Sequence, residues 1–384
     1  MISRPGSVPG LSFEHGPMPL QPKAMIRNHQ LLVILLMMFM LDACQDHPTK
    51  TDGGIREGIS ELVKDSVAGE HPPFQECHAS TILHLDDGSF IVAWFGGDKE
   101  KNPNVGIWIT HGRPHAWAAP VEVAKIRNDA HWNPVLFRSP AGRIFLFFKV
   151  GKDTEYWETW VKTSDDNGMT WSEAKELVPG DKGGRGPVRS RPIILSDGSW
   201  LAGSSHEFKG FHCFTDRSTD SGKTWVATPY ISLSDSALVG KELIQPTLWE
   251  SSPGIVHMLI RSELGKIFRS DSKDFGQHWS PIYATDLPNP NSGIDVVKMA
   301  DGTLVLAYNP DNKNDGDRAP LLLAISKDNG KTWAKGHVVQ DGRPEEEFSY
   351  PGLIRFGDTL ALSYTFNRKN IAFWMGTLSE RKEK

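Results

Sequence analysis

A motif that returns at a constant spacing restricts the fold of this chain more than any other feature. The pattern Ser-x-Asp-x-Gly-x-Thr-Trp occupies residues 164–171, 218–225 and 326–333, and a variant with His in place of Thr occupies 272–279. The motifs close 54 residues apart on Trp171, Trp225, Trp279 and Trp333, and Trp117 closes an eroded copy one period earlier. A fixed period of this length is typical of repeat architectures such as propellers, in which each repeat is one supersecondary unit.

The residues of the motif suit a structural turn rather than a catalytic one. Asp accepts hydrogen bonds from the backbone of a tight turn, Gly adopts backbone angles that other residues avoid, and Trp buries a large ring. The motif resembles the Asp-box, also called the bacterial neuraminidase repeat. We expect its aspartates to lie on the outer rim, away from the centre of the molecule: Asp166, Asp220, Asp274 and Asp328.

A second turn marks each repeat and joins two short apolar strands. It occurs six times, at Asp87-Gly88, Ala141-Gly142, Asp197-Gly198, Pro253-Gly254, Asp301-Gly302 and Phe356-Gly357. Six hairpins predict an all-β fold, a six-bladed β-propeller with Asp-box repeats. Because the sixth repeat is incomplete, we expect a strand within 55–67 to complete it and to close the ring.

Composition agrees with this fold and excludes several functions. The chain has 13 Trp, 36 Gly and 26 Pro, which suits many short strands joined by tight turns. A net charge of −5 without long runs of one sign argues against nucleic acid as a partner. Apart from Cys44, only Cys77 and Cys213 are present, too few for a disulfide framework, and their spacing predicts no metal site. We expect no cofactor.

The N-terminal region has the pattern of an export signal. Residues 31–41 form an apolar run too short to span a bilayer, with Arg27 and His29 before it and Ala43 and Cys44 after it. The segment 41–44 resembles the bacterial lipobox, although Asp42 departs from it. The alternative is an ordinary signal peptide with a chance cysteine.

This pattern divides the chain into three parts. Residues 1–44 are interpreted as an upstream extension and a lipoprotein-type signal peptide that reads best from Met25, with lipidation at Cys44. Residues 45–54 are polar and turn-rich and suit a flexible tether, and 55–384 form the propeller. We therefore expect an exported periplasmic or cell-surface lipoprotein of a bacterium, monomeric, that meets the membrane only through its lipid anchor.

The candidate site residues lie where the first strand of each blade begins, because these positions meet at the mouth of a propeller's central funnel. The segments there are unusually polar: 75–80, 131–134, 189–192, 243–246, 291–295 and 345–351. From them and from neighbouring loops we expect one pocket formed by His78, Gln245, Arg261, Asp295, Arg318 and Tyr350. Arg191, Asn133 and Lys149 are further candidates for binding a glycan substrate.

Over roughly residues 70–380 the chain resembles the sialidase superfamily, and more closely the bacterial predicted neuraminidases. Segments 77–97 and 287–302 carry this likeness, together with the repeats. Sialidases use three arginines for the substrate carboxylate, a Tyr nucleophile with a Glu partner, and an Asp acid; the Tyr is an exception among glycosidases. The resemblance implies that Arg261 and Arg318 bind the carboxylate and that Tyr350 is the nucleophile, with Phe348 as the alternative register.

Three positions depart from the family pattern. His78 stands in place of the first arginine, and Gln245, with Glu242 nearby, in place of the glutamate. The acid loop offers Asp98 and Glu100, whereas Asn102 or Asn104 lies closest to the family's aspartate. A neutral imidazole grips a carboxylate less well than an arginine fork, and Gln cannot act as a general base.

Three functions remain open from the sequence. The first is an exo-glycosidase that removes a terminal acidic sugar, with Tyr350 and Glu347 available for catalysis. The second is a histidine-based hydrolase or lyase on glycans capped by rhamnose or uronate, in which His78 and His131 act. The third is a non-catalytic glycan-binding propeller. A sugar could then stack on the rings of Trp94, Trp108, Trp132 and Trp160.

Overall fold

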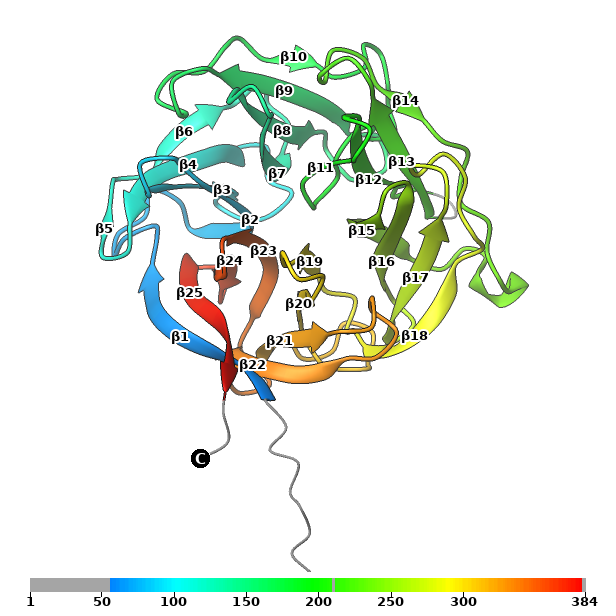
Figure 1. Cartoon of the computed structure of the whole chain (residues 1–384). Coiled ribbons are helices and arrows are strands. Elements are labelled where there is room, and N and C mark those ends of the chain that lie inside the picture. Colours follow the sequence, from blue (N-terminus) through cyan, green and yellow to red (C-terminus); the bar gives the residue numbers. More distant parts are fainter. Residues whose placement is uncertain (1–55, 209–210, 382–384) are drawn as a thin grey trace, which may run out of the picture. The chain divides into compact units, whose positions relative to one another are not determined.

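A computed structural model describes residues 56–208 and 211–381 of the chain. These residues form six antiparallel sheets arranged as blades around a common centre (Figure 1). The predicted six-bladed β-propeller is therefore confirmed. Among the described residues the structure contains a single short 3-10 turn, Ser236–Leu238, and no helix long and apolar enough to cross a membrane. Cys44 and both boundaries of the predicted tether lie outside the described residues.

The first three blades follow the chain in order. Blade 1 contains β2 (Glu76–His84), β3 (Phe90–Gly97), β4 (Gly106–Arg113), β5 (Ala116–Trp117) and β6 (Val121–Ala124). Blade 2 contains β7 (His131–Arg138), β8 (Ile144–Val150), β9 (Glu158–Ser164) and β10 (Lys175–Glu176). Blade 3 contains β11 (Ile193–Ile194), β12 (Trp200–His206), β13 (His212–Ser218) and β14 (Val226–Ala227).

The last three blades complete the ring. Blade 4 contains β15 (Leu243–Ser252), β16 (Ile255–Ser262), β17 (Lys266–Ser272) and β18 (Tyr283–Pro288). Blade 5 contains β19 (Asp295–Lys298), β20 (Leu304–Tyr308), β21 (Leu321–Ser326) and β22 (Ala334–Gln340). Blade 6 contains β23 (Phe348–Phe356), β24 (Thr359–Phe366), β25 (Asn370–Arg381) and, as its outermost strand, β1 (Arg56–Ser66).

The pairing of β1 with β25 closes the ring between the two ends of the chain. The antiparallel register runs from Arg56 opposite Arg381 to Ser66 opposite Ala372. The carboxylate of Asp65, near the end of β1, accepts a hydrogen bond of 2.9 Å from Trp117 Nε1 in blade 1. The strand expected within 55–67 therefore joins blade 6 and also contacts blade 1.

The core lies between the faces of neighbouring blades, because side chains alternate along each strand. In β8, Ile144, Leu146 and Phe148 pack toward blade 1. Phe145 and Phe147, the residues between them, pack toward Trp200 and Trp225 of blade 3. A strand that is buried on both faces explains the continuous apolar run of β8.

The Asp-boxes are turns between the third and fourth strands of blades 2 to 5. In blade 3, Asp220 Oδ1 accepts hydrogen bonds from Lys223 N and Thr224 N at 3.1 and 2.9 Å, and Oδ2 accepts one from Thr224 Oγ1 at 2.6 Å. These bonds lower the pKa of Asp220 to about 2. First and third strands run in the same direction, so each box lies at the opposite end of its blade from the predicted site.

Candidate functional site

A repeated backbone distortion shapes the start of the innermost strand in four blades. Strands β2, β7, β15 and β23 each carry a bulge at the same point of the repeat, and each bulge contains a non-glycine residue with positive φ. These residues are Ala79 (56°), Asn133 (40°), Gln245 (55°) and Tyr350 (53°). Such strained conformations persist where the surrounding structure supports them, and they cluster at functional sites. In blades 4 and 6 the bulges position Gln245 and Tyr350.

Tyr350 lies at the centre of a group of arginines. Its hydroxyl accepts a hydrogen bond from Arg261 Nη1. The guanidinium carbons of Arg189, Arg261 and Arg318 lie 5.4, 5.3 and 5.6 Å from the centre of its ring. The ring of His78 packs against it with 4.1 Å between ring centres. Tyr350 is only half-buried, so a tyrosine surrounded by positive charge is partly open to solvent.

Arg261 is held by a chain of buried polar groups. Its Nη1 donates to Gln245 Oε1 at 3.0 Å, and its Nε and Nη2 donate to Asn291 Oδ1 and O at 3.0 and 2.6 Å. The other end of the Gln245 amide, Nε2, donates to Glu207 Oε1 at 2.9 Å. Burial raises the pKa of Glu207, although its bond from Gln245 and the charge of Arg261 oppose this shift. Glu207 thus fixes the amide of Gln245 with its oxygen facing Arg261.

A second group of charges surrounds Glu347. Its carboxylate accepts hydrogen bonds from Arg318 Nη1 (3.0 Å), Arg368 Nε (2.8 Å) and Ser349 Oγ (2.6 Å), and Arg368 also pairs with Glu100. Burial acts to raise the pKa of Glu347, but the two arginines outweigh it and the pKa is lowered. Glu347 is therefore an ionised clamp that orients Arg318 and Arg368, rather than a proton donor.

The two candidate histidines are buried in different surroundings. His78 Nδ1 is hydrogen-bonded to Thr365 Oγ1 at 2.9 Å and lies 3.9 Å from Glu347 Oε1. Burial, with the charges of Arg368 and Arg318, places the pKa of His78 well below its usual value. His131 is fully buried in blade 2; its Nε2 accepts from Ile126 N at 2.7 Å, and its Nδ1 lies 3.0 Å from Asp129 O. These contacts make His131 a structural group.

The structure brings together five of the six residues expected to share one pocket: His78, Gln245, Arg261, Arg318 and Tyr350. Asp295 is the sixth, and its partners differ. Its carboxylate accepts from Thr247 Oγ1 at 2.8 Å and from Leu353 N at 2.9 Å. Arg191 Nη1 lies 3.3 Å from the same carboxylate. Asp295 on β19 therefore links blade 5 to β15 of blade 4 and β23 of blade 6. Arg191, which precedes β11 of blade 3, pairs with Asp295 rather than joining the group around Tyr350.

The remaining candidates have other environments. Lys149 is fully buried, and its ammonium donates to Thr159 Oγ1 and Gly184 O at 2.6 and 2.8 Å, so it has a structural role where the sequence suggested substrate binding. Asn133 is buried at the bulge of β7. Asp98, on the loop after β3, is exposed and accepts from Gln75 Nε2 at 3.3 Å.

Two members of the site were not predicted from the sequence, Glu207 and Arg368. Both follow the second strand of a blade, β12 and β24, whereas most of the predicted site residues lie at the starts of first strands. An antiparallel second strand returns to the end where the first began, so its last residues face the same mouth. Charged residues directly after each second strand were the signal that could have identified them.

The arrangement suits an anionic ligand. Arg189, Arg261, Arg318 and Arg368 contribute four positive charges, and the paired carboxylates Glu347 and Glu100 offset two of them. Guanidinium groups bind carboxylates through paired charged hydrogen bonds. Within residues 56–208 and 211–381, no three His, Cys, Asp or Glu side chains are grouped so that they could hold a metal ion.

The chain belongs to a known family. The BNR repeat-like domain family matches residues 88–362, which is more than half of the chain. No curated protein matches the sequence. The family assignment agrees with the Asp-boxes and with the blades that carry them.

Solved structures share this propeller at low sequence identity. A Dyadobacter fermentans protein of unknown function has a TM-score of 0.68 at 13% identity, over 84% of this chain and 100% of that one. A Hadza microbial sialidase has a TM-score of 0.65 at 16% identity, over 80% and 66% of the two chains. The Trypanosoma rangeli sialidase in complex with the inhibitor DANA has a TM-score of 0.62 at 14% identity, over 83% and 59%. These likenesses establish a sialidase-like fold.

Proposed function

We propose that this protein is an exported glycosidase that removes a terminal acidic sugar from glycans. The observation that carries the proposal is the hydroxyl of Tyr350 bonded to Arg261, inside a group of three arginines, Arg189, Arg261 and Arg318. These arginines supply the charge that a sugar carboxylate requires. Sialidases are among the solved structures that share this fold, which supports an acidic sugar as the substrate. Cys44, outside the described residues, is proposed as the lipid anchor, which mass spectrometry of membrane-extracted protein would test.

The proposed reaction uses Tyr350 as the nucleophile. Its hydroxyl loses a proton to water, and the Arg261 guanidinium stabilises the negative oxygen that remains. This oxygen bonds to the anomeric carbon as the glycosidic C–O bond breaks, and a carboxyl group gives its proton to the departing oxygen. We assign that proton to Asp98, because Glu100 is paired with Arg368. Water then attacks the anomeric carbon and gives a proton to the Asp98 carboxylate as the bond between that carbon and the Tyr350 oxygen breaks. This releases the sugar, and the Tyr350 oxygen takes back a proton from solvent.

Gln245 has a supporting role in this scheme. An amide cannot accept the proton of Tyr350, so it cannot replace the general base that a glutamate would provide. Its oxygen instead holds Arg261 Nη1 at 3.0 Å, next to the hydroxyl of Tyr350. The buried ring of His78 packs against the ring of Tyr350 and supports its orientation. Because the pKa of His78 is lowered, its imidazole does so as a neutral group.

The test is a comparison of two variants on an active substrate. The wild-type protein is incubated with sialylated, rhamnosylated and uronate-capped glycans, and the free sugars and new reducing ends are analysed. Tyr350→Phe should abolish turnover of an acid-capped glycan, whereas His78→Ala should mainly raise KM. The reverse order would favour a histidine-based hydrolase or lyase. Binding to glycans with no turnover on the whole panel would instead favour a non-catalytic glycan-binding propeller.

A further inference from the structure

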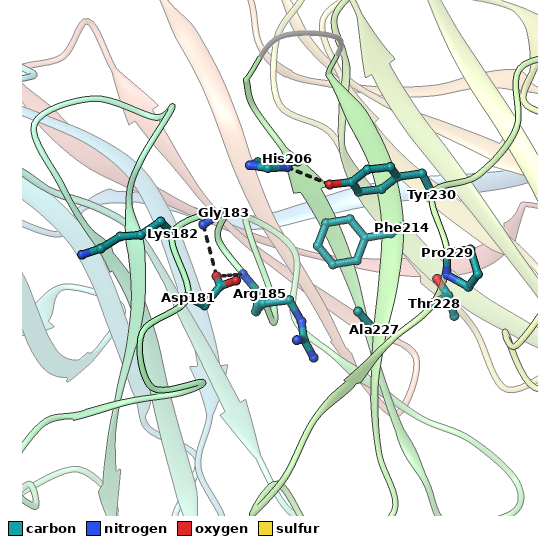
Figure 2. A pocket seen from close by; sticks show the side chains of 10 residues that line it. All are labelled: Asp181, Lys182, Gly183, Arg185, His206, Phe214, Ala227, Thr228, Pro229 and Tyr230. Carbon is teal, nitrogen blue, oxygen red and sulfur yellow. Dashed lines mark hydrogen bonds between the residues drawn. The ribbon is translucent and has the colours of Figure 1, made fainter.

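A cavity lies between blade 3 and the 181–185 loop that precedes it, and the proposed reaction does not use this cavity. It has a volume of about 510 Å³, in the range of small-molecule sites. We call it the blade-3 cavity. Its lining residues are Asp181, Lys182, Gly183, Arg185, His206, Phe214, Ala227, Thr228, Pro229 and Tyr230 (Figure 2).

One wall of the blade-3 cavity is aromatic and rigid. Tyr230 is 52% exposed, and its ring stacks on His212 with 4.4 Å between ring centres. Phe214 packs edge-on against it at 5.9 Å. The hydroxyl of Tyr230 is hydrogen-bonded to His206 Nδ1 at 2.9 Å, which fixes the ring (Figure 2). An ordered and partly exposed aromatic ring offers an apolar surface with a polar tip.

The opposite wall is a polar loop that is also held in place. Asp181 Oδ2 accepts hydrogen bonds from Gly183 N and Arg185 N, both at 3.2 Å (Figure 2). Arg185 donates two hydrogen bonds to the carboxylate of Asp216, at 2.8 and 2.7 Å. The cavity is thus bounded by an aromatic ring on one side and by charged groups with spare hydrogen-bonding capacity on the other.

The charges on the polar wall are balanced, which selects the class of ligand. Arg185 is neutralised by the buried carboxylate of Asp216, and Lys182 is paired with Glu158. Asp181 adds a further negative charge beside these two ion pairs. A wall without surplus positive charge does not favour an anion, unlike the arginine group around Tyr350. Donors and acceptors side by side suit hydroxyl groups, which both donate and accept.

We propose that the blade-3 cavity binds a neutral pyranose sugar, with one apolar face of the ring on Tyr230 and the hydroxyls toward the 181–185 loop. This sugar would be an inner unit of the glycan whose acidic end lies at Tyr350, and in that respect the inference rests on the proposed function. His206 directly precedes Glu207, which is bonded to Gln245 in the group around Tyr350. Consecutive residues of one chain segment therefore belong to the cavity and to the group around Tyr350.

A binding experiment without turnover tests the cavity by itself. Methyl glycosides of glucose, galactose and mannose are titrated into the full chain and followed by saturation-transfer NMR and calorimetry. We expect at least one glycoside to bind the wild-type protein. Tyr230→Ala should weaken that binding about tenfold, which corresponds to about 1.4 kcal/mol. Tyr230→Phe keeps the ring and should retain most of the affinity.

The matched control is Tyr283→Ala, which removes a tyrosine that is 38% exposed on β18 of blade 4. It should leave binding unchanged, and thermal unfolding verifies that all three variants are folded. Absence of binding to the wild-type protein, or equal binding by Tyr230→Ala, would overturn the proposal. Glycoside binding that depends on Tyr230, in a protein without turnover on acid-capped glycans, would keep the cavity and refute the proposed reaction.

Discussion

Individual residues of the propeller are held in protonation states that make its stability depend on pH. His131 is the clearest case, because its Nε2 accepts a backbone N–H and can do so only when the ring is neutral. Burial lowers the pKa of His131 to about 4. The unfolded chain takes up a proton at this side chain near pH 6.5, whereas the folded chain does so only near pH 4. The stabilisation is therefore present above pH 6.5 and is lost as the pH falls toward 4.

We predict that His131→Gln reduces this pH dependence. The free energy of unfolding, from urea titrations between pH 7 and 4.5, should fall less steeply in the variant. The difference in slope should approach at most about 1.4 kcal/mol per pH unit. His71→Gln, at an exposed position, is the control and should retain the wild-type slope. Parallel curves for His131→Gln and the wild type would contradict the assignment.

Glu207 should make the free energy of unfolding depend on pH in the opposite direction. Its pKa is raised in the folded state, so the unfolded chain loses the proton first as the pH rises above about 4.5. The wild-type protein therefore loses stability at this residue between pH 4.5 and the folded pKa. Glu207→Gln removes the titration and can still accept from Gln245. In urea titrations, its stability relative to wild type should increase from pH 4.5 to 7. A constant difference would show that Glu207 is already ionised in the folded protein.

At the scale of single elements, each Asp-box fastens its blade to the blade before it. In blade 4, Trp279 Nε1 donates to Thr215 Oγ1 of blade 3 at 3.1 Å, and that hydroxyl donates to Gly276 O at 3.2 Å. Gly276 has a φ of 76°, and a Cβ atom there would lie 2.4 Å from Leu201 of blade 3. The glycine thus serves both the turn and the close contact between blades.

Two glycine substitutions separate these effects. Gly240→Ala meets a similar φ of 75° with no atom within 4 Å of the new Cβ, so it should cost only the backbone strain, about 1–2 kcal/mol. Gly276→Ala should cost about 1–3 kcal/mol more, because it also overpacks the contact with Leu201. Urea unfolding measures both values. Equal losses would mean that the box turn does not depend on its contact with the preceding blade.

At the scale of the whole molecule, the ring is closed by side-chain burial as well as by backbone pairing. Ile59 of β1 is 3% exposed and packs in the core between blades 5 and 6, while Leu62 on the same strand is 57% exposed. We predict that Ile59→Asp lowers the free energy of unfolding by more than about 3 kcal/mol, since it buries an unpaired charge. Leu62→Asp should stay within about 0.5 kcal/mol of wild type. Similar stability of the two variants would show that β1 contributes little to closure.

The parts of this structure that depend on neighbours in sequence were predictable, and those that depend on neighbours in space were less so. The turn chemistry of each Asp-box is local, and its period defined the blades. Tyr350, Arg261 and Arg318 followed from resemblance to a family. Arg368 and Glu207 did not, because their roles come from contacts with Glu347 and Gln245, residues on other strands or blades. Lys149 was expected to bind a glycan substrate, but its ammonium is bonded to the backbone of Gly184 and Arg185 in the loop that covers it.

The pairing of the first strand with the last also bears on how the protein is made. Of the strands within residues 56–208 and 211–381, synthesis produces β1 first and its partner β25 last, so Ser66 can pair with Ala372 only after all the others have been made. Contacts this distant in sequence form late in folding. A chain interrupted during synthesis has no β25, and its unpaired strand edges are open to proteases and to association with other chains. Closure of blade 6 thus distinguishes a chain that has been synthesised through β25 from a shorter one.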